Sequence, residues 1–172
     1  AIWSNACSSG QEVYSIAMIL HDHFPHLHDW KVRLVASDIS DEMLARAKEG
    51  RFNQTEVDRG LSKELLQRHF ETFQNGWRIQ EKIRSRIEYR KINLIEPWPS
   101  DFKDFDIVFL RNVLIYFEPA VKTNILSRIH RTMRPDGLLF LGNAETTINL
   151  NVPFQRKTCQ KAVYYQRDTK AS

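Results

Sequence analysis

Long apolar runs are missing from this sequence, and no stretch approaches the roughly 20 consecutive apolar residues that cross a bilayer. The N-terminus also lacks the charged-then-apolar order of a secretory signal peptide. We therefore expect a cytoplasmic protein with no direct membrane insertion. Cysteine is scarce as well: Cys7 and Cys159 lie far apart, form no zinc-binding pattern, and are expected to be free thiols.

A large excess of one charge is also absent. The 172 residues contain 25 Lys and Arg against 21 Asp and Glu, which gives a net charge of +4. So small an excess does not indicate a nucleic-acid partner unless the basic groups cluster. The composition, 42% hydrophobic and 27% charged, is that of a globular protein, and the length suits one domain over residues 1–172.

Strand and helix patterns alternate along most of the chain. Residues 1–3 and 32–36 are short apolar runs, and residues 11–24 have helical spacing and end before Pro25. A second helix is expected to start at Ser40 and to stop at Gly50. This order predicts an α/β, Rossmann-like fold with a mostly parallel sheet covered by helices.

Residues 53–82 interrupt the alternation and predict a small inserted subdomain. It should contain a helix at 62–69 and a β-hairpin around the Asn75-Gly76 pair. The α/β order resumes with strands at 87–92 and 105–110, a helix from Pro119 to Pro135 and a strand at 138–141. Phe154 and residues 162–165 are expected to form a closing antiparallel pair.

Polar residues follow the predicted strands, at the edge where parallel sheets bind ligands. The turn at residues 6–10 consists of small side chains, and Glu12 begins the next helix. It is either an ordinary tight turn or a place where a ligand approaches the backbone. Asp38 ends the second strand, where a carboxylate can accept both hydroxyls of a ribose. A helix-capping role for Asp38 is less favoured, since Ser40 can cap.

Two later strand ends carry further candidates. Asn93 follows the third strand and can donate to and accept from an adenine edge, although an Asn in a turn is often only a turn former. Arg111 follows the buried strand at 105–110. A guanidinium there needs an anionic partner, which is either a ligand carboxylate or an internal acid.

Taken together, several motifs of this sequence resemble those of the CheR family of chemotaxis receptor methyltransferases. Their order and spacing match across nearly the whole chain. The matching segments are Trp3-Ser4-x-Ala6-x-Ser8-Ser9-Gly10-x-Glu12-x-Tyr14-Ser15, Ala36-Ser37-Asp38-Ile39, Ile92-Asn93-Leu94, Arg111-Asn112-Val113-x-Ile115-Tyr116-Phe117 and Pro135-Asp136-Gly137-Leu138-Leu139-Phe140-x-Gly142.

The resemblance implies a class I methyltransferase domain that uses S-adenosyl-L-methionine and yields S-adenosyl-L-homocysteine. By the same resemblance, Glu12 contacts the methionine amino group and Asp38 the ribose. Asn93 and Leu94 would lie in the adenine region.

The resemblance also assigns the reaction centre. Arg111 and Asn112 would contact the cofactor and the reacting groups, and Tyr116 matches the family's tyrosine beside the transferred methyl group. The implied reaction is protein-glutamate O-methylation, which forms methyl esters on the cytoplasmic helices of methyl-accepting chemotaxis receptors. A class I methyltransferase with another substrate, or a SAM-binding or receptor-docking module without turnover, is the alternative.

The chain departs from the family pattern in two respects. The family has Gly-Glu-Glu-Pro-Tyr-Ser where this chain has Gly10-Gln11-Glu12-Val13-Tyr14-Ser15, so the second carboxylate is kept. Family members also carry an N-terminal helical domain that supplies an arginine to the cofactor carboxylate. We expect these 172 residues to fold without that domain but to bind S-adenosylmethionine more weakly than a longer chain.

A basic cluster near the inserted hairpin offers a possible docking surface. Arg84, Arg86, Arg90 and Lys91 would either face a glutamate-rich receptor helix or form an ordinary solvated surface.

Overall fold

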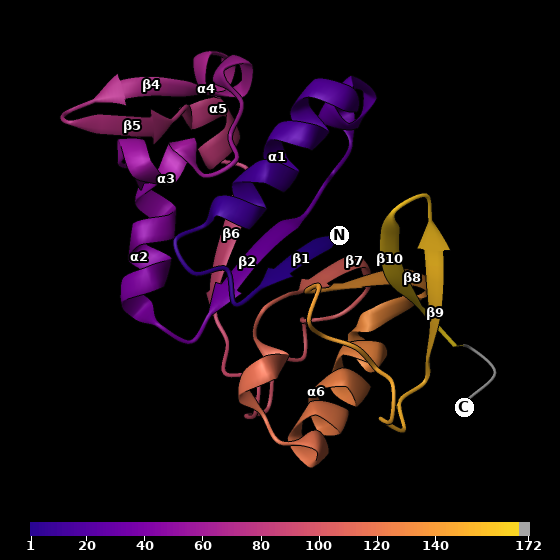
Figure 1. The fold of residues 1–172 in the computed structure, drawn as a ribbon. Coiled ribbons are helices and arrows are strands. Elements are labelled where there is room, and N and C mark those ends of the chain that lie inside the picture. The colour runs from indigo at the N-terminus through magenta and orange to yellow at the C-terminus, as the bar shows by residue number, and fades with distance from the viewer. Residues whose placement is uncertain (169–172) are drawn as a thin grey trace. The chain divides into compact units, whose positions relative to one another are not determined.

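The computed structural model describes residues 1–168. Its contacts divide the chain into two compact units. The amino-terminal unit comprises residues 7–91. The carboxyl-terminal unit comprises residues 1–6 together with the chain from residue 92 onward. Figure 1 shows the strands and helices of each unit with their labels.

The amino-terminal unit contains a parallel strand pair, the helices that cover it and an inserted small sheet. Its elements are α1 (Gln11–His23), η1 (Pro25–Asp29), β2 (Leu34–Asp38), α2 (Asp41–Glu49), β3 (Arg51–Phe52), α3 (Gln54–Asp58), α4 (Lys63–His69), β4 (Phe70–Phe73), β5 (Gly76–Ile79), α5 (Glu81–Arg84) and β6 (Ile87–Lys91). Strands β2 and β6 pair in parallel, with Asp38 opposite Lys91. Their carboxyl ends therefore lie at one edge.

A hydrogen-bonded tyrosine pair joins the elements of this unit. The Tyr14 hydroxyl of α1 donates to the Ala47 carbonyl of α2, and the Tyr89 hydroxyl of β6 donates to the Tyr14 oxygen at 2.9 Å. Burial raises the pKa of Tyr14 to about 12, so the phenol stays protonated at neutral pH. The pair holds the two helices in place, and each of these helices begins just after a turn that carries candidate site residues.

The inserted sheet has the strand order β3-β5-β4. The predicted hairpin is confirmed, since β4 and β5 pair in antiparallel register with Phe73 opposite Gly76. The predicted helix is also confirmed as α4, which Ser62 caps. Strand β3 and helix α3 were not predicted. A capping box between Asn53 and Glu56 starts α3, and this local signal is present in the sequence.

The carboxyl-terminal unit has a five-stranded sheet section in the order β1-β7-β8-β10-β9. Its elements are β1 (Ile2–Asn5), β7 (Phe105–Leu110), η2 (Leu114–Tyr116), α6 (Pro119–Thr132), β8 (Met133–Leu141), β9 (Phe154–Cys159) and β10 (Ala162–Arg167). Strands β1, β7 and β8 are parallel, whereas β10 pairs antiparallel with both β8 and β9. The carboxyl ends of β1, β7 and β8 lie side by side, because the pairing aligns Asn5 with Leu110 and Leu110 with Leu141.

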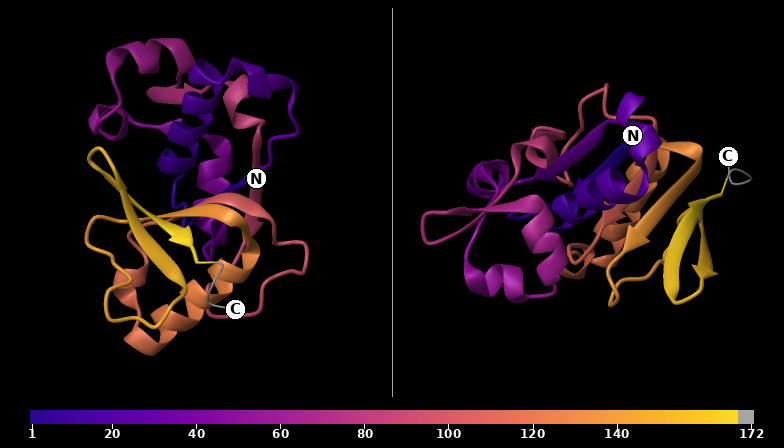
Figure 2. Two further views of the ribbon diagram at one scale, coloured as in Figure 1. Left: turned by 90° about the vertical axis from the view of Figure 1, so that its right-hand side faces the viewer. Right: turned by 90° about the horizontal axis from the view of Figure 1, so that it is seen from above.

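The core of this unit surrounds Trp3, which is fully buried on β1. Its ring lies 5.2 Å from the ring of Trp98 and 4.6 Å from that of Phe102, both edge to face. Helix α6 lies along β7 and β8 (Figure 1) and buries Ile125 and Ile129 completely. Figure 2 shows β9 and β10 as a long hairpin, coloured yellow. These contacts hold the ends of the strands, after which the candidate site residues Asn93 and Arg111 lie.

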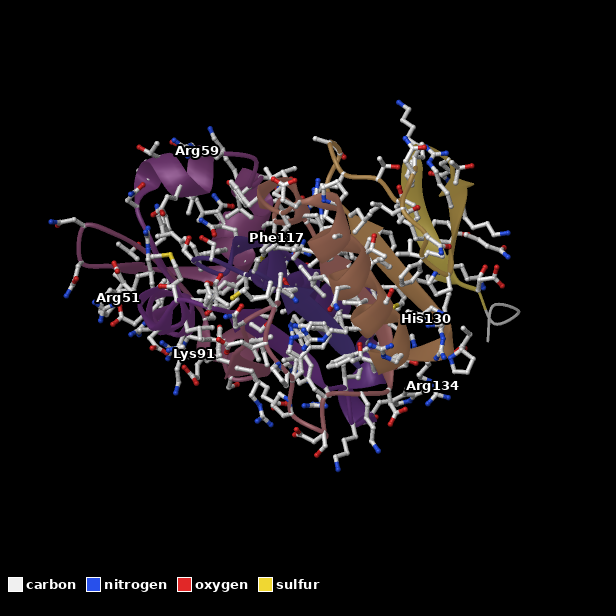
Figure 3. All side chains as sticks on the ribbon, turned by 90° about the horizontal axis from the view of Figure 1, so that it is seen from below. Arg51, Arg59, Lys91, Phe117, His130 and Arg134 are labelled. Atoms are coloured by element: carbon white, nitrogen blue, oxygen red, sulfur yellow. The ribbon has the colours of Figure 1, made fainter. Side chains whose placement is uncertain are left out.

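The boundary between α6 and β8 corrects a sequence prediction. The helix was expected to reach Pro135, but it ends at Thr132 and the strand begins at Met133. Pro135 disfavours a helical conformation at the preceding residue, Arg134, which Figure 3 labels beside this junction. The register then shifts, because Met133 faces Phe105 and Leu138 faces Ile107, so the residues between them bulge out of the ladder.

These elements confirm the predicted α/β fold with a mostly parallel sheet, an antiparallel C-terminal strand and an inserted hairpin. Among the helices of residues 1–168, none is both long and apolar enough to span a membrane.

Candidate functional site

The turn after β1 has an unusual backbone. Ala6, Ser8 and Gly10 all have positive φ, at 50°, 50° and 94°. For a residue with a Cβ, this conformation costs about 1–2 kcal/mol. Such residues cluster at ligand-binding sites, where the surrounding structure holds them. Added to Gly10, a Cβ would come within 3.1 Å of the Tyr14 ring. Similar positive φ values occur in the hairpin turns at Gln74 and Gln160, so the backbone alone leaves both sequence interpretations of this turn open.

Asp38 connects this turn to the end of β2. One carboxylate oxygen accepts the Ser8 N–H at 2.8 Å, and the other accepts the Ser40 N–H at 3.0 Å. The cap of α2 is Ser40, whose hydroxyl accepts the Met43 N–H at 3.2 Å. Since a carboxylate can accept about four hydrogen bonds, each Asp38 oxygen retains capacity for a hydroxyl donor. Asp38 is therefore oriented by the backbone and still able to bind a ribose.

Two carboxylates lie close to the buried thiol of Cys7. Burial, together with the negative charges of Asp38 and Glu12, raises the pKa of Cys7 to about 12. Glu12 is half-buried in the first turn of α1. The thiol is therefore protonated at neutral pH and is no nucleophile. The amino-terminal unit thus places Glu12 and Asp38 near one turn. That these two residues bind a cofactor stays a prediction.

Asn93 and Leu94 lie in a turn that α6 anchors. The Asn93 Oδ1 accepts the Ile95 N–H at 3.2 Å, so this residue does form the turn, and its amide nitrogen is the group left to donate to an adenine edge. Leu94 is only 6% exposed, so its side chain packs inside the unit. Arg128 of α6 donates to the Leu94 carbonyl at 2.8 Å and lies 4.1 Å above the Trp98 ring.

The segment after β7 carries the predicted reaction-centre residues. Arg111 is half-buried and lines an open pocket of about 650 Å³, together with the stacked rings of Phe109 and Phe140. Asn112 has a positive φ of 56°, which turns the chain sharply. Tyr116 ends the short helix η2 and is 78% exposed, so its ring is accessible to an incoming molecule.

Glu145 holds this segment and was not found from the sequence. Its side chain is only 9% exposed. It accepts N–H bonds from Asn112 at 2.8 Å, Val113 at 2.8 Å, Leu114 at 2.7 Å and Gly142 at 2.7 Å. No sequence motif marks Glu145 as a site residue, because its contacts depend on how β7 and β8 pair.

The basic cluster near the hairpin is largely paired. Arg84 bonds to Glu81, Arg90 to Glu88, and Lys91 to Asp41. These pairs neutralise part of the charge that would attract an acidic helix, so this surface is a weaker docking candidate than the sequence indicated. Within residues 1–168, no three His, Cys, Asp or Glu side chains are grouped to hold a metal ion.

Comparison with known proteins gives a consistent result. Residues 1–163 match the sequence model of a family described as CheR methyltransferase, SAM binding domain. The chain is 46% identical over 170 residues to "Chemotaxis protein methyltransferase 1" of Pseudomonas aeruginosa and 45% identical to "Chemotaxis protein methyltransferase Cher2" of Pseudomonas putida. Each alignment covers 96% of this chain and 61% of the relative, so the chain spans about three fifths of those proteins.

The fold is similar to that of solved methyltransferases. A TehB-like SAM-dependent methyltransferase from Corynebacterium glutamicum superposes with a TM-score of 0.57 at 12% identity, over 96% of this chain and 79% of that chain. At this identity the likeness concerns the fold alone.

Proposed function

Because this chain belongs to the CheR methyltransferase family, as its S-adenosylmethionine-binding domain, we propose that it methylates glutamate side chains of chemotaxis receptors. S-adenosylmethionine is the cofactor. The products are a glutamate methyl ester and S-adenosylhomocysteine. The observation that carries the proposal is the match of residues 1–163 to the family model. The Asp38 carboxylate, which two backbone N–H groups orient beside a small-residue turn, supports the cofactor site.

The residues of each unit fit the cofactor's chemistry. In the amino-terminal unit, Asp38 can accept the ribose hydroxyls, and Glu12 can pair with the methionine ammonium group. In the carboxyl-terminal unit, the Asn93 amide and the Leu94 backbone suit an adenine edge. Arg111 has the charge to pair with the methionine carboxylate or with the acceptor. Asp38 is the last residue of a parallel strand, and the other four lie in segments that come after such strands, where ligands bind in these sheets.

Methyl transfer to a carboxylate depends more on the placement of the two reacting groups than on proton transfer. When bound, the cofactor supplies a methyl group that its positively charged sulfur has already activated. A glutamate carboxylate, with a reference pKa of about 4.3, is ionised at neutral pH and needs no general base. Orientation of such reacting groups contributes several kcal/mol, up to about 7–11. We assign Arg111 and Asn112 to orienting the site and the exposed Tyr116 to shaping the methyl pocket.

The proposed partners follow from the relatives. Two proteins that are 46% and 45% identical to this chain are named chemotaxis protein methyltransferases, which supports chemotaxis receptors as substrates. Their acceptor glutamates would lie on cytoplasmic helices, so we place the reaction in the cytoplasm. The net charge of +4 favours an acidic protein partner weakly and offers no basis for proposing nucleic acid.

Radiolabel transfer tests the proposal. The protein is incubated with S-adenosylmethionine labelled on the methyl group and with a cytoplasmic fragment of a chemotaxis receptor from the same organism. We expect label on the fragment and its release as methanol in mild alkali, because esters hydrolyse there and N-methyl groups do not. A fragment whose acceptor glutamates are replaced by alanine is the control. Alkali-stable label would exclude a glutamate ester.

A further inference from the structure

The carboxylate of Glu145 is enclosed by backbone amides. Oε1 accepts from Val113 and Leu114, and Oε2 accepts from Asn112 and Gly142, all at 2.7–2.8 Å. Removing a charged group from water is costly unless hydrogen bonds replace the lost hydration. Four amide donors, two to each oxygen, provide that replacement. The arrangement therefore ties a nearly buried charge to one short stretch of chain.

That stretch follows β7 and leads into η2. The positive φ of Asn112, at 56°, lets three consecutive N–H groups, those of residues 112–114, converge on one anion. Such a concave group of amides binds anions. Here a side chain of the same protein is the anion, and it fixes the direction in which Arg111 leaves β7 and η2 presents Tyr116.

Close packing at Gly142 supports the same conclusion independently. A Cβ added there would lie 2.5 Å from the Asn112 Oδ1 and 2.6 Å from the Glu145 Oε2. Real Cβ atoms do not approach so closely, so the loop after β8 touches the Asn112 turn directly. The turn is held by contact as well as by hydrogen bonds, and only glycine fits.

We propose that Glu145 is a positioning residue for methyl transfer. It acts through the backbone of residues 112–114, which places Arg111 and Tyr116 for the reaction. This inference rests on the function proposed above, because it assumes that these two side chains serve the transfer step.

The first test replaces Glu145 by glutamine. In E145Q the side-chain NH₂ faces two of the four N–H donors, so one pair of hydrogen bonds is lost and the turn shifts. We expect the transfer rate per bound S-adenosylmethionine, at saturating acceptor, to fall by about ten- to a hundredfold, as small misplacements do. The number of cofactor sites, measured by calorimetric titration, should stay near that of the wild type.

Two further variants make the result decisive. G142A inserts a methyl group into the same contact without removing charge and should lower the rate per bound cofactor in the same way. Glu64, whose side chain is 74% exposed on α4, provides the matched control E64Q, which should keep the wild-type rate. A merely structural role would lower the number of binding sites and leave the rate per site unchanged.

The outcomes separate the two claims. Wild-type rates per bound cofactor in both E145Q and G142A would overturn the positioning role while leaving the proposed function intact. Loss of cofactor binding in both variants would also overturn it, because the contacts would then serve binding. A wild-type protein that transfers no methyl group would overturn the proposed function and the inference with it.

Discussion

Replacing Asp38 by alanine should separate cofactor binding from folding. The carboxylate would lose two ribose hydrogen bonds, each worth about 1.5–3 kcal/mol for a charged acceptor. Affinity for S-adenosylmethionine should therefore fall by roughly 10²- to 10⁴-fold. The free energy of unfolding should fall less than the binding free energy does, because the amide of Ser8 is near solvent and water can replace its hydrogen bond to Asp38. By the same measure the two bonds, to Ser8 and Ser40, contribute at most about 3–6 kcal/mol together, and less where water replaces them, against a typical stability of about 5–15 kcal/mol.

Calorimetric titration of S-adenosylhomocysteine, with urea unfolding of the same samples, measures both quantities. Asp41 provides the control, because its side chain is 75% exposed and makes only a surface ion pair with Lys91. D41A should bind the cofactor as the wild type does. Unchanged affinity in a folded D38A protein would refute the placement of Asp38 in the site.

Three further predictions concern stability and reactivity. Gly10→Ala should lower the unfolding free energy in urea by about 1–2 kcal/mol, since φ is 94° there, and a wild-type value would refute the strain. At pH 8 a thiol reagent should label the exposed Cys159 but spare the buried Cys7, whose pKa is raised to about 12; mass spectrometry that finds equal labelling of the folded protein would contradict this. Burial and the nearby arginine charge lower the pKa of His130 in the folded protein. As the pH falls, the unfolded chain therefore takes up a proton at this histidine before the folded protein does, and the free energy of unfolding should fall below about pH 6.5. This loss should be smaller in His130→Gln and unchanged in the exposed His26→Gln, and equal pH profiles of unfolding would show that His130 contributes nothing.

Strand ends were predictable because hydrophobic runs and polar residues lie next to one another in the sequence. Asp38 ends one buried strand and Arg111 directly follows another, and the parallel topology then determines at which edge they lie. The cap at Ser40 was equally local, because an N-cap bonds only to its own first turn.

Features that depend on pairing between distant segments were not predictable. The bonds from Glu145 to residues 112–114 span more than 30 positions and arise from the register of β7 with β8. No pattern near Glu145 encodes that register. The bulge before Leu138 likewise depends on a distant segment, since it forms against Phe105 of the neighbouring strand. The end of α6 at Thr132, by contrast, has a local cause in Pro135.

The identity of the methylated side chain tests the central claim most directly. After incubation of the protein with S-adenosylmethionine and a receptor cytoplasmic fragment, peptide mass spectrometry before and after mild alkali locates each added methyl group. The account predicts alkali-labile methyl groups on glutamate residues only, and far fewer of them in a sample made with the D38A protein at the same low cofactor concentration. Alkali-stable methyl groups on lysine, arginine or histidine, or no methylation by a protein that binds the cofactor, would contradict it.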